Sequence, residues 1–375
     1  MSDSRQELPT DLQRDLKELG ADLATFHVSL DVLARVLRQF GALPVEKIAK
    51  LDGEIAAAGK LFVFYGEHIG DHSLPNPLRE FLERRGVLPE PKRSITKIEK
   101  EQMFHQLLQV EPDLEFLFLF HRNGYLRQAA LDKLDAPLPN GFFLAALAYR
   151  LNDWVPQVSA AAAGCLARVL PKTEREIIAK AAIGLMDRAF HWRRWGAEAE
   201  ILEQAFSQAD VVPLIASILR EAKTGPMGRT LGLALRWPLL DEHISDLSKN
   251  AVMPAVRGRA LRVLLDGRAT WHIGYEKQMV NPYHRIIRRV PSFQSRSVMR
   301  SEPLEAIIHQ GALDRSPAVR KVAATALVQN RQTLANRDEI IALLKDDRSP
   351  SVRSAIEFVV RKLKEEAASS SLASS

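Results

Sequence analysis

The chain has 375 residues and a formal net charge of +6, from 52 basic and 46 acidic residues, and its core must be built mainly from aliphatic side chains because only 7% are aromatic. Its single cysteine, Cys165, excludes an intrachain disulfide and a thiolate-rich metal site. No apolar run reaches the roughly 18 residues that span a bilayer, and the polar start differs from a signal peptide, so we expect a cytoplasmic protein.

The first hundred residues are predicted to be helical over residues 10–40 and 45–69, without the repeat found further on. Residues 72–93 contain four prolines and are predicted to be a linker or an extended loop. We therefore expect a helical N-terminal region, residues 1–99, that either caps the following repeats or forms a separate partner-binding module.

A short motif recurs in the rest of the chain. Pro-Ala-Val-Arg stands at residues 254–257 and 317–320, and Pro-Ser-Val-Arg stands at residues 350–353. Looser copies around positions 127, 159, 194 and 229 give a period of roughly 30 to 40 residues, which is typical of stacked helix pairs. The one long interval, 63 residues from Arg257 to Arg320, predicts an insertion of roughly 30 residues.

The motif has a physical explanation as the start of a second helix. An Asp before the motif can cap the helix, and Pro in the first turn loses no hydrogen bond. Apolar residues at Val322, Ala323, Ala326 and Leu327 then form one buried face. The first helices of the pairs are predicted at residues 113–122, 141–151, 173–189, 210–222, 241–249, 303–310 and 338–344. The last helix is predicted to end near residue 367, and residues 368–375 form a Ser-rich, disordered tail.

This motif resembles the HEAT repeat family, an armadillo-like class, over residues 100–367. The resemblance implies an all-α fold, a right-handed α-solenoid of about six to seven helix pairs with a helical N-terminal extension. In that family the turn Asp and the Arg of the motif form a ladder between neighbouring repeats. The resemblance gives these roles to Asp314 and Arg320 in one repeat and to Asp347 and Arg353 in the next. Arg257 has only the Arg half, because Ala251 stands where Asp is expected.

The insertion, residues 267–301, has seven basic residues and one acid, Glu276, and we expect it to be a loop. Arginines bind phosphates through two parallel hydrogen bonds, and aromatic rings stack on unpaired bases. The same residues also suit an acidic protein surface, and a solvated loop over a repeat edge is the third alternative. The candidate binding residues are Arg268, Trp271, Tyr275, Lys277, Tyr283, Arg285, Arg288, Arg289, Arg296 and Arg300.

Trp192, Arg193 and Trp195 form a weaker candidate, since their composition resembles that of HEAT-like DNA glycosylases. The two tryptophans share a helix face, so packing in the core or at a repeat edge is the favoured interpretation. The sequence has no His-Glu dipeptide of the kind that binds iron in HEAT-like deoxyhypusine hydroxylase, and it has no phosphate-binding glycine motif. We therefore expect no metal, no cofactor and no catalytic centre.

The sequence thus predicts a non-enzymatic binding scaffold. Its concave HEAT surface and basic aromatic insertion would recognise an acidic protein partner. The alternative is a nucleic-acid-binding HEAT-like protein, with a relation to DNA base-repair glycosylases as one option. The sequence leaves the oligomeric state open.

Overall fold

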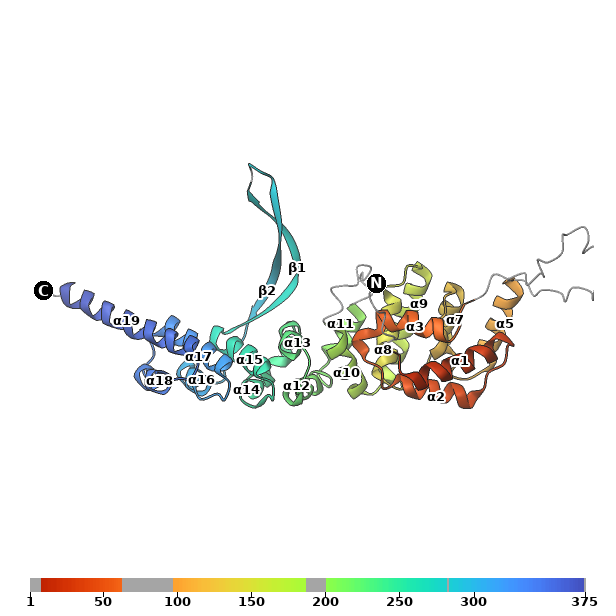
Figure 1. Ribbon diagram of the computed structural model, residues 1–375, viewed down its shortest axis with the longest axis horizontal. Helices are drawn as coiled ribbons and strands as arrows, with labels where there is room; N and C mark the ends of the chain where they lie inside the picture. The colour runs from red at the N-terminus through yellow and green to blue at the C-terminus, as the bar shows by residue number, and fades with distance from the viewer. Residues whose placement is uncertain (1–7, 63–96, 187–199, 282, 374–375) are drawn as a thin grey trace, which may run out of the picture. The chain divides into compact units, whose positions relative to one another are not determined.

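The computed structural model describes residues 8–62, 97–186, 200–281 and 283–373. These residues are predominantly helical and include one two-stranded antiparallel sheet (Figure 1). The chain divides into two compact units, residues 1–181 with 192–203 and residues 182–191 with 204–375.

The first unit begins with the helices of the N-terminal region and continues into the first helix pairs. Its elements are α1 (Thr10–Ala24), α2 (Leu30–Phe40), η1 (Val45–Lys47), α3 (Ile48–Ala58), α5 (Lys97–Val110), α6 (Leu114–Phe118), α7 (Gly124–Lys133), α8 (Gly141–Leu151), α9 (Pro156–Val169) and η2 (Leu170–Lys172). The division between the units falls within α10 (Arg175–Leu185) and α11 (Glu200–Phe206).

The N-terminal helices share a core with the helices that follow residue 99. Helix α3 packs against α8, and α2 packs against α6. The ring of Phe40 lies 5.5 Å from Phe120, 5.7 Å from Phe142 and 5.6 Å from Phe143, so aromatic packing joins the two parts. The four prolines of the expected linker lie outside the described residues.

The second unit consists of paired helices and the sheet. Its elements are α12 (Val212–Glu221), α13 (Met227–Ala234), η5 (Pro238–Leu240), α14 (Asp241–Asn250), α15 (Pro254–Asp266), β1 (Arg268–Asn281), β2 (Ile286–Ser297), α16 (Leu304–Ala312), α17 (Pro317–Asn330), α18 (Arg337–Leu344) and α19 (Pro350–Ala373). Helix α14 pairs with α15, α16 with α17, and α18 with α19. The second helices of the pairs also contact one another in order, α13 with α15, α15 with α17, and α17 with α19. The last helix ends at Ala373 rather than near residue 367.

Arginine–aspartate pairs join successive helix pairs. Arg257 donates from Nε and Nη2 to Asp314 at 2.7 and 2.9 Å, and from Nη1 to the carbonyl of Ala251 at 2.8 Å. Arg320 binds Asp347 in the same way, at 2.5 and 3.0 Å. Arg257 bonds to the backbone carbonyl of residue 251 and not to its side chain. It therefore keeps this hydrogen bond although Ala251 stands where Asp was expected.

The aspartates also shape the turns. The carboxylate of Asp314 accepts from the backbone N–H of Ser316 at 2.7 Å, and Asp347 accepts from Ser349 at 2.8 Å. Each Asp therefore fixes the turn that precedes a second helix. It also accepts hydrogen bonds from the arginine of the preceding helix pair. Arg353 binds only carbonyl oxygens, those of Asp347 and Arg348, among the described residues.

The first unit has a related network. Arg127 binds Asp153 at 2.9 and 2.8 Å, and Arg150 bridges Asp153 to the buried Asp52 of α3. Burial raises the pKa of Asp52, while Arg150 opposes that shift. Burial and the charge of Arg127 lower the pKa of His121 to about 3, so this imidazole is neutral at physiological pH.

Sequence separations show how the sheet is inserted. The paired residues Arg257 and Asp314 are 57 positions apart, whereas Arg320 and Asp347 are 27 apart. The difference of 30 residues equals the length of the hairpin from Arg268 to Ser297. The hairpin is therefore an addition between α15 and α16, and the helix pairs on its two sides keep the spacing of an ordinary repeat.

We expect Arg257→Ala to destabilise the protein by about 3–5 kcal/mol, because it leaves Asp314 partly buried without its counter-charge. Urea unfolding followed by circular dichroism measures the change. Arg353→Ala is the matched control and should cost about 1–2 kcal/mol, because the hydrogen bonds of Arg353 with described residues all go to carbonyl oxygens. Equal losses for both variants would contradict a stabilising role for the carboxylate pair.

We also expect a pH-dependent contribution from Asp347. The hydrogen bond from Arg320 is the main cause that lowers the pKa of Asp347 below its ordinary 3.8. The resulting stabilisation is complete above 3.8 and is lost as the pH falls through the lower, folded-state pKa. Urea midpoints compared at about pH 6 and about pH 3 should therefore differ more in the wild type than in Arg320→Gln. Equal differences would contradict this assignment.

Candidate functional site

The basic insertion is a β-hairpin rather than the expected loop. Strands β1 and β2 pair antiparallel, and the hairpin stands away from the helices of its unit (Figure 1). The sequence did not reveal it because two register shifts, between His272 and Gly274 and between Met279 and Asn281, interrupt the alternation that marks a strand.

The base of the hairpin is fixed to the helices. Gly267 follows the last residue of α15, and its φ of 61° is the left-handed conformation that favours glycine. Ala269 near the start of β1 and Val298 directly after β2 are buried. Arg300 donates to the carbonyls of Leu264 and Leu265, both at 2.7 Å, and so satisfies the end of α15.

Arg296 fixes the second strand to α14. Its Nη1 and Nη2 each lie 2.6 Å from the carboxylate of Asp241, and Nη2 also donates to the carbonyls of Leu235 and Trp237. Of the predicted binding residues, Arg296 and Arg300 therefore hold the hairpin in place.

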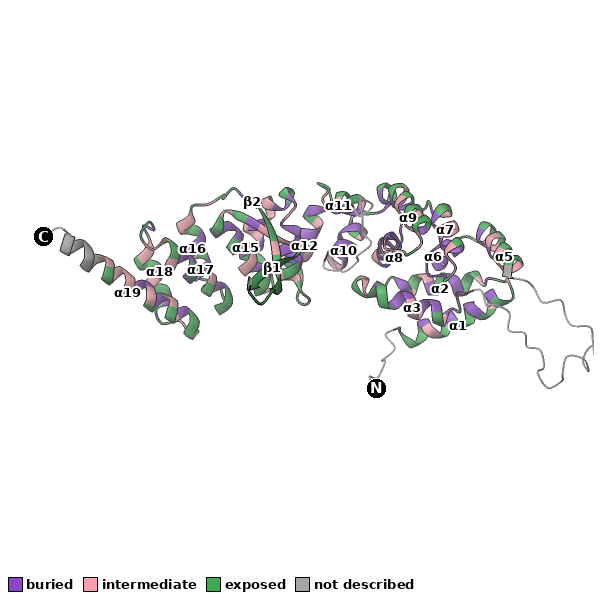
Figure 2. Ribbon diagram, turned by 90° about the horizontal axis from the view of Figure 1, so that it is seen from above, coloured by how far each residue is buried: buried purple, intermediate pink, exposed green. Residues whose placement is uncertain are grey.

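The other five basic residues of the hairpin are exposed. They make no hydrogen bond or ion pair within the described part of the chain, and the hairpin is coloured mostly as exposed in Figure 2. Glu276 is the only acid of the two strands. The hairpin therefore offers a net positive surface with its charges available to a partner. These residues are Arg268, Lys277, Arg285, Arg288 and Arg289.

The register divides the hairpin into two faces. On one face Lys277 lies opposite Arg289, and Met279 lies opposite Ile287. Like charges directly opposite one another repel, so this pair favours an anion bound between them. On the other face Gln278 lies opposite Arg288.

Aromatic side chains occupy the first face and the tip. His272 lies 4.9 Å from the ring of Tyr275 and 5.6 Å from Phe293, so the three rings form a cluster. Tyr275 is 67% exposed and Phe293 is 54% exposed. Tyr283 in the turn is 96% exposed, whereas Trp271 is half-buried. Phe293 was not among the predicted binding residues. Its position within the basic insertion was the sequence signal that could have identified it.

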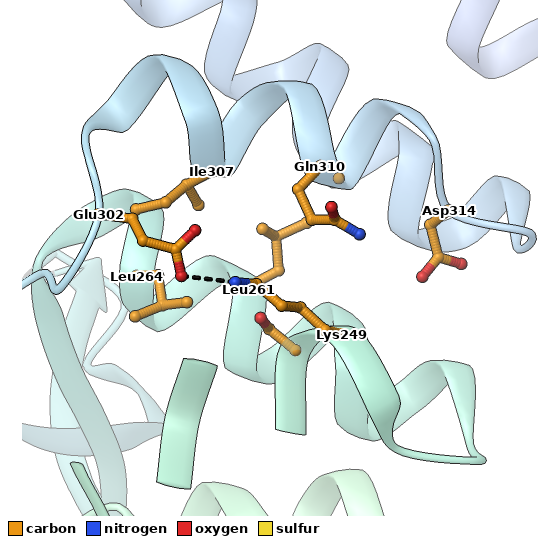
Figure 3. Close-up of a pocket in the computed structure, with 9 residues that line it drawn as sticks. Lys249, Leu261, Leu264, Glu302, Ile307, Gln310 and Asp314 are labelled. Atoms are coloured by element: carbon orange, nitrogen blue, oxygen red, sulfur yellow. Dashed lines mark hydrogen bonds and ion pairs between the residues drawn. The ribbon is translucent and has the colours of Figure 1, made fainter. Parts of the chain in front are cut away.

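A small cavity between α14, α15 and α16 offers no substrate site. Figure 3 shows the residues that line it, and its volume is about 10 Å³, enough for about one water molecule. Lys249 donates to Glu302 at 2.5 Å and Ser245 donates to it at 2.9 Å, and these bonds lower the pKa of Glu302, with Lys249 the larger cause. The carboxylate is therefore paired and not available as a general acid near neutral pH.

Trp192, Arg193 and Trp195 fall in residues 187–199, outside the described residues. Within the described ranges, no group of three or more His, Cys, Asp or Glu side chains could hold a metal ion. None of the described helices is both long and apolar enough to cross a bilayer. Burial raises the pKa of the Cys165 thiol to about 12, so it does not act as a nucleophile.

Neither a protein-family model nor a curated protein matches this chain. The hairpin has a base that is fixed to the helices and an exposed outer part. Its five exposed basic side chains have no partner among the described residues, so the hairpin is the candidate binding site.

We expect Arg296→Ala to loosen the hairpin, because it removes two charge-assisted hydrogen bonds to Asp241. Amide hydrogen exchange in β1 and β2 should become at least about tenfold faster, corresponding to about 1.4 kcal/mol. Arg268→Ala is the control, since Arg268 makes no such bonds, and its exchange should match the wild type. Unchanged protection in Arg296→Ala would show that strand pairing alone holds the hairpin.

Proposed function

We propose that this chain is a nucleic-acid-binding protein of the HEAT-repeat type, and that the hairpin docks in the major groove of duplex DNA. One observation carries the proposal. A two-stranded ribbon of 30 residues stands clear of its helices and presents five basic side chains that have no partner in the described residues.

The dimensions favour B-form DNA. Its major groove is about 12 Å wide and admits a two-stranded β-ribbon, whereas the minor groove is about 6 Å wide. The major groove of an RNA duplex is deep and narrow, and side chains do not reach its bases. With about 3.3 Å per residue, the 12 residues of β2 extend about 40 Å, slightly more than one turn of the duplex.

The two faces suit different contacts. Lys277 and Arg289 lie side by side and suit phosphate oxygens, which also relieve their mutual repulsion. Gln278 and Arg288 on the other face are side-chain types that pair with adenine and guanine edges in the major groove. Binding through such contacts depends strongly on salt.

The helices serve as the support for the ribbon. We infer that the helix pairs stack as a solenoid, an arrangement supported by the ordered contacts between second helices and by the arginine–aspartate pairs. A frame of this kind holds the base of the hairpin rigidly, so the ribbon does not need to order itself on binding.

An acidic protein partner is the second candidate. The exposed rings of Tyr275 and Phe293 beside arginines favour it, because tyrosine and arginine are enriched among the residues that dominate protein interfaces. The concave surface of a solenoid would then contribute further contact area.

The triple variant Arg285→Glu, Arg288→Glu, Arg289→Glu should abolish binding to duplex DNA, since it reverses three unpaired cations. For the wild type, fluorescence anisotropy should show about 10²-fold weaker binding at 200 mM than at 50 mM salt if about four phosphates are contacted. Duplex DNA should bind more tightly than duplex RNA.

The matched control is Lys321→Glu, Lys345→Glu, Arg348→Glu, which makes the same charge change at exposed positions of the same unit outside the hairpin. It should retain most of the affinity. Equal losses of DNA affinity in both triple variants would show that binding depends on the overall charge of the protein and not on the hairpin. Absence of DNA binding at low salt, with capture of an acidic protein that the hairpin variant abolishes, would favour the second candidate.

A further inference from the structure

A cavity of about 690 Å³ lies in the first unit, where α7 and α9 begin. This volume is in the range of small-molecule sites. Tyr125 and Trp154 line the cavity and are 74% and 70% exposed. Neither ring stacks on another ring among the described residues. Two large aromatic side chains left open to water at the mouth of one cavity indicate a binding surface rather than a core.

The local structure holds both rings in place. Asn123 caps α7 by accepting from the backbone N–H of Tyr125 at 2.8 Å. Asp153, which is fixed by Arg127, accepts from the N–H of Val155 at 3.1 Å and so shapes the turn that contains Trp154. The backbone under each ring is therefore ordered before any ligand binds.

Polar groups of three kinds share the cavity. The amides of Gln128 and Gln157 form no hydrogen bond with the described residues. The side chain of Arg122 is 54% exposed, and its Nη1 lies 3.8 Å from Asp52, too far for a hydrogen bond. The carboxylate of Glu101 accepts from the amide of Asn123 at 2.7 Å. The cavity therefore offers aromatic faces, free amides, a carboxylate and a guanidinium.

We propose that this cavity binds a nucleotide unit. The base stacks on Tyr125 and Trp154, and a glutamine amide pairs with its polar edge. Glu101 accepts from the sugar hydroxyls, and Arg122 binds the phosphate. A free mononucleotide and an unpaired nucleotide in a strand both present a base and a phosphate, and the hydroxyl contact with Glu101 is added only by a ribose. The inference is independent of the hairpin, which belongs to the other unit.

Calorimetric titration of the full chain with AMP, adenosine and ribose 5-phosphate tests the proposal. AMP should bind more tightly than adenosine, and ribose 5-phosphate should bind most weakly because it has no base. Trp154→Ala and Tyr125→Ala should each weaken AMP binding about tenfold, within the range expected for loss of one stacked ring. Arg122→Gln should weaken AMP but not adenosine.

Val110→Ala is the control, because Val110 is 76% exposed in the same unit but does not line the cavity. Its AMP affinity should equal that of the wild type, and circular dichroism should show the same helix content for all variants. A short DNA duplex with one bulged adenine, compared with the fully paired duplex, separates the two sources. A preference for the bulge that Trp154→Ala removes identifies a strand nucleotide, and AMP binding without that preference identifies a free nucleotide.

Two results would overturn the inference. One is the absence of binding by AMP, adenosine and the bulged duplex at ligand concentrations up to about 1 mM. The other is nucleotide binding that neither aromatic variant changes. The hairpin variant Arg285→Glu, Arg288→Glu, Arg289→Glu should bind AMP normally, so failure of the hairpin proposal would leave this result intact.

Discussion

The buried arginine–aspartate pair is the interaction on which the rest of the structure depends. Each arginine donates to a carbonyl of its own turn and to the carboxylate of the next one, so a single side chain sets the distance between two helix pairs. Burying such charges is costly unless every donor and acceptor is satisfied. Arg257 therefore connects two helix pairs through satisfied hydrogen bonds, and the Arg127–Asp153 pair of the first unit fixes the turn that contains Trp154.

The hairpin depends on the helices for its order. An isolated two-stranded sheet is at best marginally stable in water. Here Arg296 and Arg300 fix its base through carboxylate and carbonyl oxygens, and the outer part remains free. The charge of the insertion thus serves two purposes, because some arginines position the ribbon and the others face solvent. A charge count from the sequence does not separate them.

The sequence predicted the structure better where a short motif repeats than where residues far apart in the chain come into contact. The Asp and Arg residues that now form pairs stood out because the motif repeats, and the insertion stood out as a break in its period. The hairpin did not, because Gly274 and the second register shift disturb its alternation. Tyr125 and Trp154 were also missed as site residues, since isolated aromatic residues have no spacing to detect. Their one signal was their position beside Asn123, which caps α7, and beside Asp153, which shapes the turn before α9. The packing of Phe40 against later helices joins distant parts of the chain and left no mark in the sequence.

The way the hairpin joins the helices makes its length independent of them. Arg268 and Ser297, where the ribbon enters and leaves, are cross-strand partners, so the two ends stay together however far the strands extend. Adding or removing matched residue pairs would change the reach of the tip by about 3.3 Å per pair, while α15 and α16 would keep their places. The reach of the ribbon can therefore change while the packing of the helices is kept.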